Sequence, residues 1–357
     1  MGFGVVNVVV CGQILSAVSD YTMTIAVGCV IVVVISYLVS VFGFAIIHTY
    51  EKYSWIMNFI LICILVGQAT PHITPNAPPF DSGLSLAGGI LSFLTLNFAA
   101  GSGWCSVASD YYCNYPATTK SWKVYGLTLA GILSTTSFVT IIGACIGTAA
   151  SGSEAYPPWA DAYTNHGMGG LLREIYHPLS FSKFCLVLCT FTVIGNNIVV
   201  NYSSGLSLQL LGHTFHAVPR FVWSFIVALV VAILSIVGKD HLANIVSDFV
   251  SLLGYWTISF TLILLIEDQW FRRHEGYNLE GWDNVHKLPW GVAATFTLIT
   301  SYLTGGVPGM AQGGLFLPLG ILELSDVHTP VWYVGPIAKK FGPYGGGKIS
   351  HPRALNM

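Results

Sequence analysis

The sequence predicts an all-α integral membrane protein. Of its 357 residues, 54% are hydrophobic and only 8% are charged, whereas soluble domains carry about 25% charged residues. The mean hydropathy is +0.67. The apolar residues form long uninterrupted runs, which exclude the short alternating strands of a membrane β-barrel.

These runs predict about nine transmembrane helices, since a helix needs about 20 apolar residues to cross the hydrocarbon core. The runs lie at 2–19, 23–46, 54–70, 86–109, 122–149, 181–211, 220–238, 244–266 and 290–312. The segment 150–180 is rich in glycine and proline, so we expect it to form an irregular cap. The odd number of runs and their abrupt ends lead us to expect that sequence is missing.

The basic residues predict the orientation of the runs. Alternate loops carry an excess of them at Lys52, Lys120, Lys123, Arg220, Arg272, Arg273 and Lys287. The other loops carry fewer, at Arg173, Lys183 and Lys239. Cytoplasmic loops are enriched in lysine and arginine, so the first run is expected to begin on the cytoplasmic side. The net charge of −2 and the lack of a basic cluster give no indication of nucleic-acid binding.

The sequence disfavours an enzyme. It contains no HExxH, GxSxG or P-loop motif, and no carboxylates are paired within the apolar runs. His213 and His216 can share a helix face, but no third ligand is near, so we expect no metal site. The eight cysteines lack CxxC spacing and are interpreted as small buried apolar residues.

One apolar run is interrupted by polar and small residues, between Asn97 and Tyr115. The Gly-Ser-Gly sequence at 101–103 predicts a break in the helix, because glycine is a poor helix former. In lipid, a broken helix is tolerated where its freed backbone groups line a cavity or are buried in protein. Trp104 and Ser106 follow the break, so this stretch is a candidate binding site. Asp110 is expected to be a solvated carboxylate at the cytoplasmic end of the run.

Other runs contain amide side chains. Phe3 and Asn7 are four residues apart and share a helix face, and Asn196, Asn197 and Asn201 fall within two helical turns. An amide offers donors and an acceptor in one plane, which matches the edge of a nucleobase. Aromatic side chains stack on flat heterocycles. The pattern is therefore typical of a site for a neutral, planar ligand.

Each of these features also has a structural interpretation. Asparagines in membrane helices form hydrogen bonds between helices. Tryptophan is enriched at the membrane interface, which would make Trp104 an anchor. Phe3 can pack against lipid or against the protein core. The residues alone leave both interpretations open.

Several stretches together resemble the nucleobase–cation symporter family, and within it the fungal purine–cytosine permease branch. They are GFGVVNVVVCGQIL (2–15), GWCSVASDYYCNYP (103–116), GNNIVVNYSSGLSLQLLG (195–212), LLGYWTISF (252–260) and VWYVGPIAKKFG (331–342). The resemblance implies a LeuT-like inverted-repeat transporter fold with a midplane site. Residues 1–312 then hold family helices three to eleven, so the fold is incomplete. The Trp104 run is the sixth helix and the Asn196 run the eighth.

The resemblance also implies a function. Trp104 resembles the family's base-stacking tryptophan, Asn7 the base-binding asparagine of the third helix, and Asn196 the first polar residue of the eighth-helix motif. Such a protein transports cytosine or purines across the plasma membrane by alternating access, with protons rather than sodium ions as the co-transported cation. No bound cofactor and no obligate protein partner are implied.

The chain departs from the family pattern in two motifs of the site. Phe3 stands where the family commonly has tryptophan, which removes the indole donor. The eighth-helix motif usually reads GNNxPN, so Val199 and Val200 replace a proline and a substrate-binding asparagine. An unpaired polar base edge costs about 1–3 kcal/mol. The alternatives are therefore an inactive truncated remnant, or a permease for a related heterocycle such as a nucleoside, allantoin, uracil or a vitamin.

A third departure concerns the C-terminal part of the chain. Residues 313–330 are an atypical insertion, which we interpret as a retained intron or as a genuine loop insertion. Residues 331–357 form a tail that is only partly similar to the family.

Overall fold

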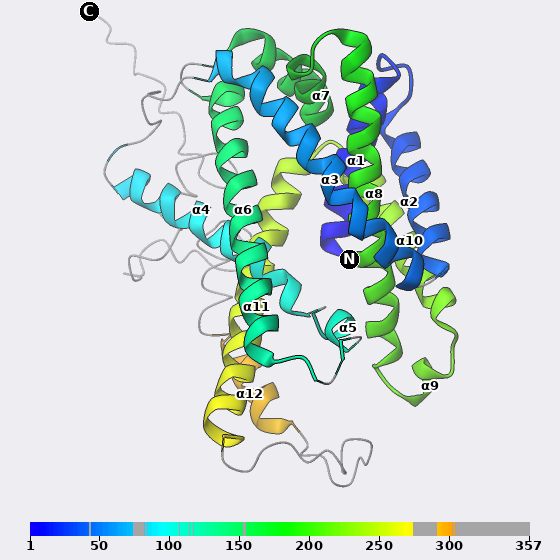
Figure 1. Cartoon of the computed structure of the whole chain (residues 1–357), viewed down its shortest axis with the longest axis vertical. Coiled ribbons are helices and arrows are strands. Elements are labelled where there is room, and N and C mark those ends of the chain that lie inside the picture. The colour runs from blue at the N-terminus through cyan, green and yellow to red at the C-terminus, as the bar shows by residue number, and fades with distance from the viewer. Residues whose placement is uncertain are drawn as a thin grey trace, which may run out of the picture. The chain divides into compact units, whose positions relative to one another are not determined.

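The computed structural model describes residues 1–42, 44–73, 82, 84–106, 108–113, 115–116, 118–152, 155–273, 291–301 and 303. The regular structure in this part of the chain is helical, with no strand, so the all-α prediction is confirmed there (Figure 1). The α-helices are α1 (Gly2–Val18), α2 (Ile25–Val41), α3 (Phe44–Ala69), α4 (Leu84–Ser102), α5 (Ala108–Tyr112), α6 (Ser121–Ser151), α7 (Pro157–Ile175), α8 (Leu179–Gln209), α9 (His213–His216), α10 (Arg220–Gly238), α11 (Leu242–Ile266) and α12 (Val292–Ser301). Short 3-10 helices cover Thr70–His72 and Gly103–Ser106, and a π-helical turn covers Glu267–Phe271.

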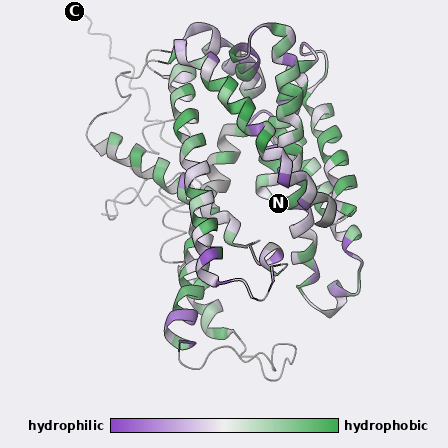
Figure 2. Ribbon diagram, in the orientation of Figure 1, coloured by the Kyte–Doolittle hydropathy of each residue, from purple (hydrophilic) through white to green (hydrophobic). Residues whose placement is uncertain are grey.

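The helices follow the predicted apolar runs, and hydrophobic residues dominate along them (Figure 2). Within the described residues, 4 helices are long and apolar enough to cross a membrane: Lys52–His72, Ser121–Ser151, Leu179–Gln209 and Arg220–Gly238. The predicted number of about nine spans stays a prediction. The predicted insertion at 313–330 and the tail at 331–357 lie outside the described residues.

The prediction of an irregular cap at 150–180 is wrong, because most of this segment is helix α7. Pro157 and Pro158 occupy its first turn, where the fixed backbone angle of proline suits a helix and its missing N–H costs nothing. Gly167, at φ 64°, kinks the helix. The indole of Trp159 is only 2% exposed and packs in an apolar cluster with residues such as Ile146.

The chain forms two compact units, the first from Met1–Pro78 and Ser137–Val246 and the second from Pro79–Thr136 and Ser247–Met357. In the first unit, α1 packs against α2, α7, α8 and α10 (Figure 1). Small residues allow the close contact of α1 with α2, since a Cβ atom at Gly12 would lie 2.8 Å from both Cys29 Sγ and the Ile25 carbonyl oxygen. Small residues at helix contacts are typical of membrane proteins, because the lipid is as apolar as the helices and close packing drives association.

Ionic contacts hold the C-terminal end of α1. Asp20, just after the helix, accepts hydrogen bonds from Arg173 Nη2 of α7 at 2.6 Å and from Lys183 Nζ of α8 at 2.5 Å. Arg173 Nη1 also donates to the carbonyl oxygen of Ala17, at 3.1 Å. The hydrogen bond from Lys183, together with both positive charges, lowers the pKa of Asp20. The carboxylate is half exposed, so we expect a modest contribution to stability.

Candidate functional site

Two of the α8 amides face the interior of the first unit. Asn197 and Asn201 are four residues apart, so they share a helix face, and each is only 5% exposed. Asn201 Nδ2 donates a hydrogen bond to Ser40 Oγ of α2 at 3.0 Å. Ser40 Oγ in turn donates to the carbonyl oxygen of Tyr37. Asn201 therefore joins α8 to α2, which favours the structural interpretation of this asparagine.

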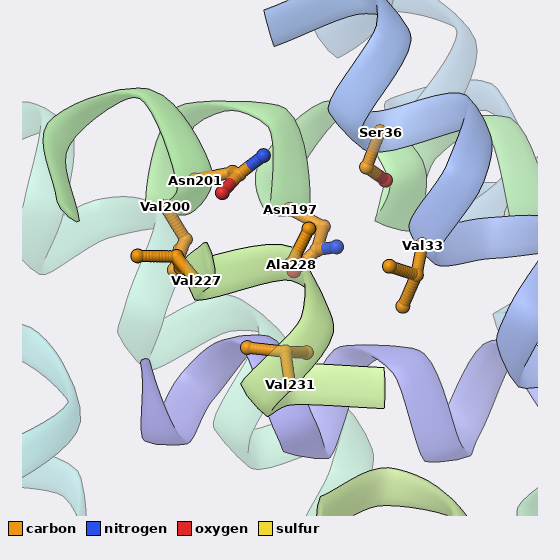
Figure 3. Close-up of a pocket in the computed structure, with 8 residues that line it drawn as sticks. All are labelled: Val33, Ser36, Asn197, Val200, Asn201, Val227, Ala228 and Val231. Carbon is orange, nitrogen blue, oxygen red and sulfur yellow. The ribbon is translucent and has the colours of Figure 1, made fainter. Parts of the chain in front are cut away.

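These two amides also line a small pocket between α2, α8 and α10 (Figure 3). Its lining residues are Val33, Ser36, Asn197, Val200, Asn201, Val227, Ala228 and Val231. The cavity volume of this pocket is about 10 Å³. Clefts that hold small molecules are far larger, at roughly 300–1,000 Å³. In this conformation the pocket has no room for a nucleobase.

Asn196 lies on a different face of α8. Successive residues of an α-helix are about 100° apart, and Asn196 is exposed where Asn197 is buried. Val200, four residues further on, is half-buried beside α1, with its Cγ1 atom 3.5 Å from the place that a Cβ atom at Gly4 would take. The α8 amides are therefore divided between a face that holds helices together and a face that does not.

On α1, the structure places Phe3 and Asn7 one turn apart, and both are half-buried. The Nδ2 atom of Asn7 is buried and has no hydrogen-bond partner among the described residues. A buried donor without a partner costs about 1–3 kcal/mol. Of the predicted site residues in the first unit, Asn7 is therefore the one with a buried donor available for a ligand.

The predicted break near Trp104 is confirmed in the second unit. Helix α4 ends at Ser102, the 3-10 helix Gly103–Ser106 follows, and α5 begins at Ala108. Trp104 is 44% exposed. Ser102 Oγ donates to Thr257 Oγ1 of α11 at 3.0 Å, so the end of α4 is fixed within this unit. The helix is interrupted where the glycines predict it, and the indole lies within the interruption.

The predicted site residues thus fall into two groups. Gly103, Trp104 and Ser106 belong to the second unit, where Ser106 is described by its backbone alone. Phe3, Asn7, Asn196, Asn197 and Asn201 belong to the first. Each group is described within its own unit.

Sequence reasoning missed the hydroxyls of α2 that face the α8 amides. Ser36 and Ser40 are 1% and 0% exposed, and Ser36 lines the pocket. Their spacing of four residues puts them on one face of a helix that is otherwise apolar. Such a pair is a usable signal for a polar contact between helices, because an isolated hydroxyl in a membrane helix needs a partner.

Comparison with known proteins shows which proteins the sequence of this chain resembles. The chain is 30% identical to the purine-cytosine permease FCY2 of Saccharomyces cerevisiae over 97% of its own length and 62% of that protein. It is also 30% identical to the purine-cytosine permease fcyB of Emericella nidulans, over 95% of the chain and 63% of that protein. The vitamin B6 transporter TPN1 of Saccharomyces cerevisiae is 29% identical over 97% of the chain and 65% of that protein. No protein-family model matches the chain, and no solved structure matches it.

Relatives that are transporters, together with the long apolar helices, support an integral membrane protein. More narrowly, it is a homologue of the fungal purine–cytosine permeases over nearly its whole length, so the resemblance seen in the sequence is confirmed. The chain spans less than two thirds of the length of these relatives.

Proposed function

We propose that this chain is part of a plasma-membrane transporter that moves a nucleobase-type heterocycle by cation symport. The observation that carries the proposal is the similarity to purine–cytosine permeases along 97% of the chain. The nature of the candidate groups agrees with it, since they are aromatic, amide and hydroxyl side chains that suit a neutral planar ligand. The fold we propose is LeuT-like and incomplete, with alternating access around a midplane site.

In this proposal the interrupted helix of the second unit supplies the stacking surface. The 3-10 helix at Gly103–Ser106 interrupts the regular α-helix and contains Trp104. Broken helices form ligand sites in transporters because their freed backbone groups and helix ends bind polar atoms. Gly103 has no side chain that would keep a ligand from the backbone, and Trp104 stacks on the ring of the ligand; Ser106 belongs to the same proposed group.

Within the first unit, the candidate groups are polar side chains that can form hydrogen bonds with a heterocycle. The unpartnered Nδ2 of Asn7 is the candidate donor there, and Phe3 lies one turn away on α1. Asn196 presents its amide from the exposed face of α8. Asn201 acts between helices instead, because it binds Ser40, and Asn197 lines a pocket too small for a heterocycle.

The coupling cation in the proposal is the proton, by resemblance to the fungal branch. The chain is also proposed to be a fragment. Uptake experiments test both points in yeast that lacks its own purine–cytosine permeases and vitamin B6 transporter. Radiolabelled cytosine and adenine are offered to cells that express this chain, or a version extended at both ends by the corresponding segments of FCY2. Uptake by the extended version but not by the chain alone supports the fragment proposal, and uptake that falls as external pH rises supports proton symport. No uptake of cytosine or adenine by either version refutes the proposal for these two bases.

A second candidate ligand is a related heterocycle such as vitamin B6. Two observations favour it: Val200 stands where the resemblance places a base-binding asparagine, and one relative is a vitamin B6 transporter. Labelled pyridoxine, offered to the same cells, separates the two ligands. If the position is correctly assigned, Val200→Asn tightens cytosine or adenine binding by about tenfold, the equivalent of about 1.4 kcal/mol. Unchanged binding of both bases would remove Val200 from the site.

A further inference from the structure

We propose that the pocket between α2, α8 and α10 binds one water molecule, which bridges α2 and α8. Ser36 of α2 and Asn201 of α8 contribute the polar side chains, which are 1% and 5% exposed. Within the described part of the chain, Ser36 Oγ and Asn201 Oδ1 have no hydrogen-bond partner. Both side chains line the same pocket, from opposite helices (Figure 3). Two unsatisfied atoms of different helices therefore share one small space.

The size of this space and its hydrogen-bonding groups fit a water molecule. A cavity needs a volume of about 10–15 Å³ to hold one water molecule. The volume of this pocket is about 10 Å³. Buried waters typically make about three hydrogen bonds with groups that lack other partners. A water at this position accepts from the Ser36 hydroxyl, donates to Asn201 Oδ1, and has the Asn197 amide beside it.

The hydrogen bond to Ser40 fixes the orientation of the Asn201 amide. Because Nδ2 of Asn201 donates to Ser40 Oγ at 3.0 Å, the amide plane is held and Oδ1 keeps one position. The bridging water then adds a second polar link between α2 and α8, next to the direct one. Water-mediated hydrogen bonds have nearly the enthalpy of direct ones. The direct bond and the water bridge therefore connect α2 and α8 through polar groups within a contact that is otherwise apolar.

A monovalent cation fits the pocket less well than water. The remaining lining residues are aliphatic, so no carboxylate balances a positive charge. The guanidinium of Arg220 already lies beside this network, with Nη2 donating to the carbonyl oxygen of Ser40 at 3.4 Å. A second cation would be desolvated without a counter-charge, which is costly. Water is neutral, and it can accept a hydrogen bond from the Ser36 hydroxyl and donate one to Asn201 Oδ1.

Hydroxyl-radical footprinting with synchrotron X-rays tests the proposal on the purified chain in detergent micelles. A bound water produces radicals next to buried side chains, and water enriched in heavy oxygen marks the products for mass spectrometry. Val227 lines the pocket and is 1% exposed, whereas Val8 and Val9 of α1 are 0% exposed and do not line it. We expect Val227 to be labelled several-fold faster than Val8 and Val9.

The variant Ser36→Ala removes one polar partner of the water with a minimal change of shape. In this variant we expect the labelling of Val227 to fall toward that of Val8 and Val9. Equal labelling of the three valines in the unmodified chain would overturn the proposal, since the pocket would be dry. Labelling of Val227 that persists unchanged in the variant would also overturn it, because bulk solvent would then be the source.

Discussion

Two amides on different faces of α8, Asn196 and Asn201, are expected to respond differently to the same substitution. Asn201→Ala removes the hydrogen bond to Ser40 Oγ, and such bonds between membrane helices average about 0.6 kcal/mol, with a maximum of about 1.7 kcal/mol. Ser40 keeps its own hydrogen bond to Tyr37, so its hydroxyl donor stays satisfied. With the packing that the amide loses, we expect a destabilisation of about 1–2 kcal/mol.

Asn196→Ala is the matched control, because it is the same substitution on the same helix. Asn196 is exposed, and exposed substitutions usually change stability by less than about 0.5 kcal/mol. Thermal unfolding of the purified chain measures both variants with a thiol-reactive dye, since buried cysteines such as Cys11 and Cys185 become accessible on unfolding. Asn201→Ala is expected to lower Tm by about 2–8 °C, at about 2–4 °C for each kcal/mol.

The two variants are expected to differ in the opposite sense when the rise in Tm that a ligand produces is measured. If Asn196 contacts the heterocycle, Asn196→Ala reduces the rise in Tm that the ligand produces, because a bound ligand stabilises the folded state in proportion to its affinity. Asn201→Ala keeps this rise. An equal loss of Tm in both variants, or a larger loss with Asn196→Ala, would refute the division of the α8 amides into two faces.

Three further predictions concern other contacts. The lowered pKa of Asp20 means that its pairing with Lys183 stabilises the fold above the unfolded pKa of about 3.9 and is lost as pH falls through the lower folded value. The difference in Tm between the unmodified chain and Asp20→Asn should therefore shrink as the pH is lowered below about 4, and a constant difference would contradict this pairing. Gly12→Ala is expected to destabilise by about 1–3 kcal/mol through overpacking, whereas Gly147→Ala, with nothing within 4 Å of the new Cβ, is expected to be neutral or slightly stabilising; equal changes in Tm would argue against the close α1–α2 contact. In a version that transports bases, Trp104→Ala should abolish uptake and Trp104→Phe should retain part of it, because base stacking is worth roughly 1–3 kcal/mol. Unchanged uptake by Trp104→Ala would exclude Trp104 from the site.

Most helices were predictable from the sequence because lipid demands long apolar segments with internally satisfied backbone groups. Helix α7 was not predictable in this way. A glycine can mark a loop, where it allows a positive φ, or a close contact between helices, where there is no room for a side chain. Gly167 does have a positive φ, as a loop glycine would. Gly169 is small for another reason, since a Cβ atom there would overlap the carbonyl oxygen of Gln13. A sequence shows that a glycine is present but not which neighbouring backbone requires it.

The placement of the α8 asparagines on a buried and an exposed face was only partly predictable, because it also depends on neighbouring helices. Periodicity predicts that Asn197 and Asn201 share a face and that Asn196 lies about 100° away. It does not say which face meets another helix, because that depends on the position of Ser40 in α2. The interruption before Trp104 was predictable because the glycines weaken the helix locally, without help from a distant residue.

The division of α8 into two faces also explains how a substrate preference can change without loss of the fold. Asn201 joins helices inside the first unit, so its replacement affects stability. Val200 makes apolar contact beside Gly4 of α1 and needs no hydrogen-bond partner. If the family's asparagine at this position binds the base, its replacement by valine removes a ligand contact and leaves the Asn201–Ser40 bond intact. The departure from the family motif therefore leaves the contacts of α8 with α1 and α2 intact.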